Sequence, residues 1–244
     1  MCDGEPLGLT GRWRQGAGAI PAQVAGAALG IVAIIAALTA VLPATPQGLL
    51  AAISAFLLVG AGVAGLMRRT YPHDRIGGCN AVTLLRAGLV CALLMPLAAG
   101  QPAGWAVAVV AGLGLSLDGL DGFLARRSGL VSRFGARFDM EVDAALALIL
   151  ALHVIAGSPV GAEVLVLGLT RYGFVLAGLV LPWLTAGLPE RRWRKAVCVI
   201  QIATLIVVQT PLLSPGQAIV LTRIAALLLI ASFAADIRWL WSRR

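Results

Sequence analysis

Charged side chains are scarce in this sequence. Only 12% of the 244 residues are Asp, Glu, Lys or Arg, whereas ordinary soluble domains have roughly 25%. Hydrophobic residues make up 59% of the chain, and the mean hydropathy is +0.92. This composition excludes a soluble globular core. Repeated apolar runs of about 20 residues are instead typical of transmembrane helices.

The sequence also lacks the cysteine spacing of a metal site. Its four cysteines, Cys2, Cys79, Cys91 and Cys198, form no CxxC pair and are interpreted as scattered thiols. The net charge of +8 does not indicate nucleic acid, because the arginines lie in short loops between apolar segments. Their expected neighbour is an anionic lipid surface. We therefore expect a lipid bilayer, and no nucleic acid, as partner.

Apolar spans separated by Gly- and Pro-containing breaks predict an all-α, polytopic membrane protein with about eight transmembrane helices. The eight spans cover residues 17–42, 48–67, 81–99, 103–125, 138–157, 161–183, 195–213 and 217–238.

Basic residues mark alternate loops between these spans. Arginines occur near both ends of the chain and in the loops after the second, fourth and sixth spans. The loops at 43–47, 100–102, 158–160 and 214–216 contain neither Lys nor Arg. The positive-inside rule then places both termini in the cytoplasm. We expect a bacterial inner membrane, with the functional site facing the cytoplasm.

Three arginines fall inside the apolar spans, at Arg86, Arg171 and Arg223. A charge within a membrane span is costly, so each of them is a candidate site residue. The alternative for each is a structural pair or a side chain that extends to the membrane surface.

Four aspartates lie in residues 116–144, at Asp118, Asp121, Asp139 and Asp143. Spacings of three and four place each pair on one face of a helix. Folding the two helices about residue 130 sets Asp118 level with Asp143, and Asp121 level with Asp139. Carboxylates this close suppress one another's ionisation unless cations neutralise them. Two divalent ions fit such a set, and oxygen ligands favour Mg²⁺ or Mn²⁺.

Small residues share the faces that carry the aspartates. Gly122, Ala125 and Gly135 leave room for a ligand or a helix to approach the backbone. Arg126 ends one of these faces, where its guanidinium could hold a phosphate oxygen. Metal ions and an arginine beside a cavity are suited to phosphoryl transfer. The alternative is a set of structural ion pairs with nearby arginines at the membrane surface.

The motif Asp118-x2-Asp121-Gly122-x2-Ala125-Arg126-x8-Gly135-x3-Asp139-x3-Asp143 resembles the signature of the CDP-alcohol phosphotransferases. The segment Asn80-x2-Thr83-x2-Arg86 resembles the first core helix of that family. The resemblance covers residues 78–240. It implies a six-helix catalytic core over 78–244 and an N-terminal extension with two transmembrane helices over 1–77.

The resemblance also implies roles for individual residues. Asp118, Asp121 and Asp139 would be the main metal ligands. Asp143 would lie near the metals and would be the catalytic base. The nucleotide site would be shaped by Gly122, Ala125, Arg126 and Gly135, with Asn80 and Thr83 lining it from the first core helix.

The reaction that the resemblance implies transfers a phosphoalcohol, here phosphatidyl, from CDP-diacylglycerol or another CDP-alcohol to a small alcohol, with release of CMP. Arg171 and Arg223 are candidates for binding a phosphorylated acceptor such as glycerol phosphate. Small residues at 60–65 suit helix packing or a homodimer contact. The alternative function is a cation transporter or channel that uses the intramembrane aspartates.

Overall fold

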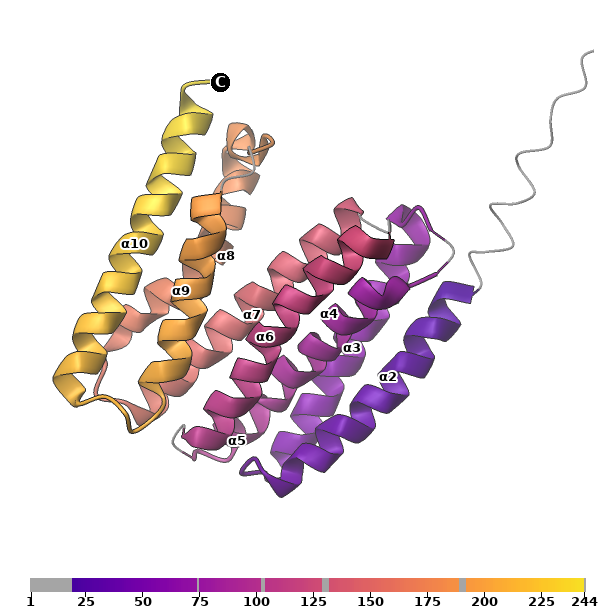
Figure 1. Cartoon of the computed structure of the whole chain (residues 1–244), viewed down its shortest axis with the longest axis horizontal. Helices are drawn as coiled ribbons and strands as arrows, with labels where there is room; N and C mark the ends of the chain where they lie inside the picture. Colours follow the sequence, from indigo (N-terminus) through magenta and orange to yellow (C-terminus); the bar gives the residue numbers. More distant parts are fainter. Residues whose placement is uncertain (1–18, 74, 102–103, 129–131, 189–191, 244) are drawn as a thin grey trace, which may run out of the picture.

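The computed structural model describes residues 19–73, 75–101, 104–128, 132–188 and 192–243. For residues 19, 120–128 and 192, only the backbone is described. The described residues form helices and contain no strand (Figure 1), so the predicted all-α class is confirmed.

The helices follow one another with short connections. The α-helices are α2 (Ala19–Ala37), α3 (Pro46–Thr70), α4 (Gly77–Ala92), α5 (Leu94–Ala98), α6 (Trp105–Ser128), α7 (Arg133–Gly157), α8 (Leu165–Val180), α9 (Arg192–Val208) and α10 (Pro215–Trp241). Three short 3-10 helices, η1 (Leu38–Ala40), η2 (Ala162–Val164) and η3 (Pro182–Thr185), lie between them.

Six helical segments are long and apolar enough to cross a membrane. They are Ile20–Ala40, Pro46–Thr70, Gly77–Ala98, Arg133–Gly157, Ala162–Val180 and Pro215–Trp241. Among the described residues of α6, the apolar part covers only Trp105–Gly119, and α9 has 17 residues. The polytopic class therefore agrees with the prediction, whereas the count of eight spans stays a prediction.

Two helices that carry site residues extend beyond their apolar spans. α7 begins at Arg133, five residues before the apolar span, because the Ser132 hydroxyl accepts a hydrogen bond from the Gly135 N–H at 3.0 Å and caps the helix. α4 begins at Gly77, four residues before its apolar span, and Gly77 has a φ of 71° that favours glycine. These starts agree with the placement of Gly135 and Asn80 on the two helices.

Helix α4 lies at the centre of the bundle. In Figure 1, α8, α9 and α10 lie to one side, α2 and α3 to the other, and α6 and α7 between them. In the most apolar window of α4, 67% of the residues are buried, against 17% for α2 and 28% for α10. A Cβ on Gly88 would lie 2.2 Å from Cγ2 of Ile31, so α2 packs directly on α4. Polar residues of α4 are therefore enclosed by protein.

Candidate active site

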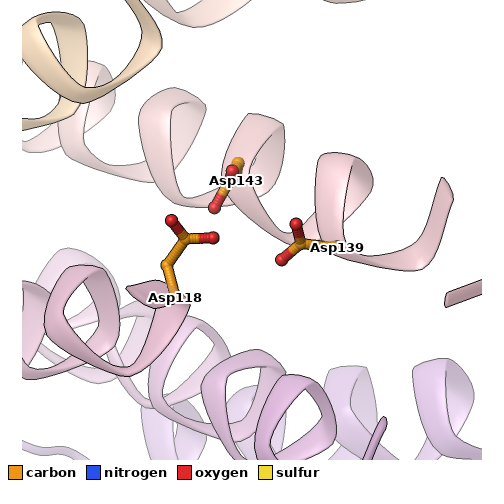
Figure 2. A group of neighbouring side chains, drawn as sticks. All are labelled: Asp118, Asp139 and Asp143. Carbon is orange, nitrogen blue, oxygen red and sulfur yellow. The ribbon is translucent and has the colours of Figure 1, made fainter. Parts of the chain in front are cut away.

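Three aspartates from two helices converge at one point of the bundle. Asp118 lies on α6, and Asp139 and Asp143 lie one turn apart on α7. Each offers a carboxylate oxygen, and these oxygens lie within 4.8 Å of one another. Figure 2 shows the three side chains gathered between the two helices. The structure thus brings together three of the four predicted metal ligands. The side chain of the fourth, Asp121, lies outside the described residues.

The guanidinium of Arg86 pairs with all three carboxylates and offsets one of their negative charges. Its Nη1 lies 3.2 Å from Oδ1 of Asp118 and also pairs with Asp139, while Nη2 pairs with Asp143. Its Nε donates to the Gly114 carbonyl oxygen at 3.0 Å. Arg86 is 1% exposed, and a buried charge is stable only when it is paired and hydrogen-bonded in this way. One arginine of α4 therefore links α6 to α7.

The three carboxylates suit a hard divalent cation. Oxygen atoms are the ligands that Mg²⁺ and Mn²⁺ prefer. Two oxygens bound to one Mg²⁺ are at most about 4 Å apart, so small side-chain movements would let the three converge further. The carboxylates are partly exposed, at 13% to 34%, which leaves a cation a route of entry. The residues present therefore fit a metal site.

Asn80 and Gly135 meet beside this cluster. The Asn80 amide donates to the Tyr71 hydroxyl at 2.9 Å and to the Ile76 carbonyl at 2.7 Å. Its oxygen faces Gly135, where a Cβ would come within 3.0 Å of it. A side chain at position 135 would therefore displace Asn80. Thr83, one turn further along α4, is buried and donates to the Cys79 carbonyl at 3.0 Å.

Tyr71 fixes this corner from the segment between α3 and α4. Its hydroxyl donates to the Ile76 carbonyl at 3.2 Å. Burial raises the pKa of the Tyr71 hydroxyl, the Cys79 thiol acts in the same direction, and the hydrogen bond from Asn80 opposes both. The phenol is therefore protonated at neutral pH and remains a donor. Sequence reasoning did not identify Tyr71.

A cavity of about 570 Å³ opens beside Asp143, between α7, α8, α9 and α10. We call it the aspartate cavity. Its lining includes Asp143, Arg171, Arg194 and Asp236, and most of its remaining wall is apolar. Arg171 pairs with Glu141, and Nε of Arg194 lies 3.4 Å from Oδ2 of Asp236. The structure thus brings Arg171, but not Arg223, to the predicted site.

Arg223 lies elsewhere in the bundle. It pairs with Glu163 of η2, with its Nη2 3.0 Å from Oε1, and its side chain is 64% exposed. It precedes Asp236 on α10 by 13 residues, which is about 20 Å along the helix axis. The predicted role of Arg223 in acceptor binding therefore has no geometric support.

Three predicted nucleotide residues, Gly122, Ala125 and Arg126, have side chains outside the described residues. Their backbone lies in the last turns of α6, beyond Asp118. They stay predictions.

From the sequence, Arg86 had no specific partner and Asp236 was not singled out. Arg86 carried one signal, a charge inside an apolar span. Asp236 is only 7% exposed although it lies near the polar end of α10. Its partner Arg194 is 42 residues away, so local spacing gives no sign of the pair.

Comparison with protein families shows the class of protein to which the aspartate cluster belongs. The sequence model of the CDP-alcohol phosphatidyltransferase family matches residues 78–236, more than half of the chain. The searches of curated proteins and of solved structures gave no match. The alternative of a cation transporter or channel gains no support, because this family consists of transferases of phosphate-containing groups. With its aspartates on α6 and α7 inside the matched region, the chain belongs to the CDP-alcohol phosphatidyltransferase family and is a transferase.

Proposed function

We propose that this transferase moves the phosphatidyl group of CDP-diacylglycerol to a small phosphorylated alcohol and releases CMP. The observation that carries the proposal is the aspartate cavity. It joins Asp143 to three arginines (Arg137, Arg171 and Arg194) and to an apolar wall within one space of about 570 Å³. The family supplies the reaction type, and the cavity supplies the argument for the two substrates.

The apolar wall of the aspartate cavity favours a lipid donor. Phe174, Val175 and Leu179 of α8 line it, together with Phe233 of α10. Val175 and Leu179 are 45% and 77% exposed, so this side of the cavity is open toward the surroundings of the bundle. An acyl chain there buries apolar surface that a water-soluble CDP-alcohol would leave uncovered.

The arginines of the aspartate cavity favour an acceptor that carries a phosphate, and two of the three are held by ion pairs. Arg171 and Arg194 lie in the same cavity as Asp143. A guanidinium binds phosphate through two parallel charge-assisted hydrogen bonds. Both arginines pair with carboxylates, which holds each guanidinium in place before the acceptor arrives. Glycerol phosphate has the required hydroxyl and phosphate.

We assign the role of base to Asp143. The acceptor hydroxyl gives its proton to the Asp143 carboxylate, and the acceptor oxygen forms a bond to the lipid-side phosphorus. The bond between that phosphorus and the bridging oxygen breaks, and the oxygen leaves with CMP together with its electron pair. A general base in hydrogen-bond reach of the hydroxyl contributes roughly 10²–10⁴-fold.

Divalent ions have a defined place in this proposal. Asp118, Asp121 and Asp139, with Asp143 beside them, would hold two ions, Mg²⁺ or Mn²⁺. When bound, such ions neutralise the charge of the pyrophosphate and of the leaving CMP. The chain itself supplies Asn80, Thr83, Gly122, Ala125, Arg126 and Gly135 around the nucleotide.

The topology completes the proposal. The alternation of basic loops supports eight spans, with the aspartates near the cytoplasmic face of a bacterial inner membrane. Residues 78–244 would form the catalytic core and residues 1–77 the extension. CDP-diacylglycerol would then enter from the bilayer, and the soluble acceptor would enter from the cytoplasm. A homodimer through the small residues at 60–65 stays a prediction, which light scattering tests.

The experiment is an acceptor screen with purified protein, CDP-diacylglycerol and Mg²⁺ or Mn²⁺, with CMP release as the readout. We expect turnover with glycerol phosphate and much less with unphosphorylated alcohols such as serine. Asp143→Asn should lower kcat by roughly 10²–10⁴-fold while the protein remains folded and monodisperse.

Two results would count against the proposal. If turnover with serine equals turnover with glycerol phosphate, the arginines of the aspartate cavity do not bind an acceptor phosphate. If no alcohol releases CMP from CDP-diacylglycerol, the lipid donor is wrong, and a water-soluble CDP-alcohol becomes the substrate to test.

A further inference from the structure

A second large cavity lies on the other face of α7, away from Asp143. It has a volume of about 700 Å³ and lies between α3, α4 and α7. We call it the α3–α7 groove. Its wall is mainly apolar and includes Val59, Gly62 and Leu66 of α3, Val90 of α4, and Phe138 of α7. The α3 residues precede residue 78, where the family match begins, so the groove depends on the extension.

The length of the groove suits one leaflet of a bilayer. On α3 its lining runs from Val59 to Thr70, and on α7 from Arg133 to Ala145. At 1.5 Å per residue these stretches are about 16 Å and 18 Å long. Half of the hydrocarbon thickness of a bilayer is about 15 Å. An acyl chain that starts at the Arg133 end would therefore lie along the whole groove.

The charge at this end favours an anion. Arg133 and Arg137 line the groove one turn apart and are both exposed. Neither forms an ion pair with any residue that the structure describes. Glu141, the one carboxylate among the described lining residues, is already paired with Arg171. Two positive charges are thus left at the mouth of an apolar groove.

We propose that the α3–α7 groove binds one acyl chain of an anionic phospholipid, with the lipid phosphate at Arg133 and Arg137. The lipid is a resident of the leaflet and not the reacting donor. None of the three clustered aspartates lines the groove, whereas Asp143 lines the aspartate cavity. Arg137 lines both spaces, and Arg133 lines the groove but not the aspartate cavity. The proposal does not depend on which donor or acceptor the transferase uses.

Filling the groove tests the proposal. Gly62 lines the groove, and a Cβ on it meets no atom within 4 Å, so Gly62→Leu directs a side chain into open space of the groove. Gly65 lies on the same helix, is equally free of neighbours and does not line the groove. Gly65→Leu is therefore the matched control. Both changes replace a glycine by a better helix former.

The measurement is a native mass spectrometry titration of the purified, delipidated protein with phosphatidylglycerol and with phosphatidylcholine of the same acyl chains. We expect phosphatidylglycerol to bind the wild-type protein more tightly than phosphatidylcholine. Gly62→Leu should weaken binding of phosphatidylglycerol at least tenfold, and Gly65→Leu should leave it within twofold. Arg133→Gln should lower the preference for phosphatidylglycerol about fivefold, as expected for one basic residue at an anionic surface.

Four outcomes would overturn the proposal. Equal losses in both leucine variants would show that binding does not use the groove. Equal binding of the two lipids would remove the role of the arginines. Competitive displacement of phosphatidylglycerol by CDP-diacylglycerol would make the groove part of the donor site. If the wild-type protein has the mass of a dimer and Gly62→Leu has the mass of a monomer, a second copy of the chain occupies the groove instead of a lipid. None of these readouts uses turnover, so they stand apart from failure of the proposed reaction.

Discussion

Removing the Arg86 guanidinium should make the stability of the protein depend on divalent metal. The change is Arg86→Gln, which keeps a polar side chain but deletes the positive charge. Three carboxylates, Asp118, Asp139 and Asp143, would then face one another without their counter-ion. The Gly114 carbonyl would also lose its charged donor.

The size of the effect follows from the burial of Arg86, which is 1% exposed. Deleting one partner of a buried ion pair costs about 3–5 kcal/mol. For a chain of this size, 1 kcal/mol shifts the unfolding midpoint by about 2–4 °C. In EDTA, the midpoint of Arg86→Gln should therefore fall by about 6–20 °C. The three aspartates are partly exposed, which favours the lower part of that range.

Divalent metal should restore much of this loss. A cation at 100 times its Kd stabilises the folded state by about 2.7 kcal/mol. In the wild-type protein the cation must compete with the guanidinium for the same oxygens. Metal should therefore raise the unfolding midpoint more in Arg86→Gln than in the wild type.

The assay is thermal unfolding in detergent, followed by tryptophan fluorescence, in EDTA and in a Mg²⁺ or Mn²⁺ titration. The protein is purified with metal present so that the variant is folded at the start. Arg86→Lys is the matched control, because it keeps one charge and loses the planar fork that reaches the three carboxylates. Its unfolding midpoint should lie between those of the wild type and Arg86→Gln. The reasoning would be refuted if the unfolding midpoint of Arg86→Gln in EDTA lay within 2 °C of the wild-type midpoint. It would also be refuted if metal raised the midpoint more in the wild type than in the variant.

Three further changes address acceptor binding, the hydrogen bonds between Tyr71 and Asn80, and the packing of the N-terminal extension. Arg171→Gln should raise KM for the phosphorylated acceptor roughly tenfold, whereas Arg223→Gln should leave it within twofold; equal effects in the two variants would contradict the assignment. Tyr71→Phe should raise KM for the CDP donor about 2–10-fold at nearly constant kcat, the worth of one net hydrogen bond, and an unchanged KM would exclude a positioning role. Gly88→Ala should lower the free energy of unfolding by about 1–3 kcal/mol through overpacking, measured against Gly26→Ala, where a Cβ meets nothing within 4 Å.

The convergence of the aspartates was predictable because it depends on local spacing. Residues three or four apart share a helix face, and a hairpin brings two such faces together. Asp118, Asp139 and Asp143 meet in the structure as this geometry requires. The all-α class followed in the same way, from the length of the apolar runs.

Partners far apart in the sequence were not predictable from spacing. Arg86 is 53 and 57 residues from two of the aspartates that it pairs with. Its position inside an apolar span indicated importance, but not which residues it contacts. Arg171 and Arg223 gave the same signal, yet Arg171 lines the aspartate cavity and Arg223 pairs with Glu163 at a distance from it. A buried charge shows that a partner exists, and only the fold shows which one.

Apolar spans are shorter than helices where polar residues continue a helix. The fifth apolar span begins at residue 138, whereas α7 begins at Arg133 because Ser132 caps it. The turn before the span carries both arginines of the α3–α7 groove. Their place beside α3 depends on tertiary packing, which local spacing does not reveal.

The order of the helices along the chain bears on how the protein is assembled in the membrane. Synthesis proceeds from the N-terminus, so α4 is made before the acidic partners of Arg86 on α6 and α7. Placing a lone arginine at the centre of a bilayer costs about 2.5–3.5 kcal/mol on insertion scales. α2 and α3 are already made at that stage, and α2 packs closely on α4 at Gly88. Gly88 lies about 200° around the helix from Arg86, so this contact leaves the guanidinium uncovered. The charge therefore stays unmatched until α6 and α7 have been made, and a chain that ends before α6 should integrate α4 less efficiently.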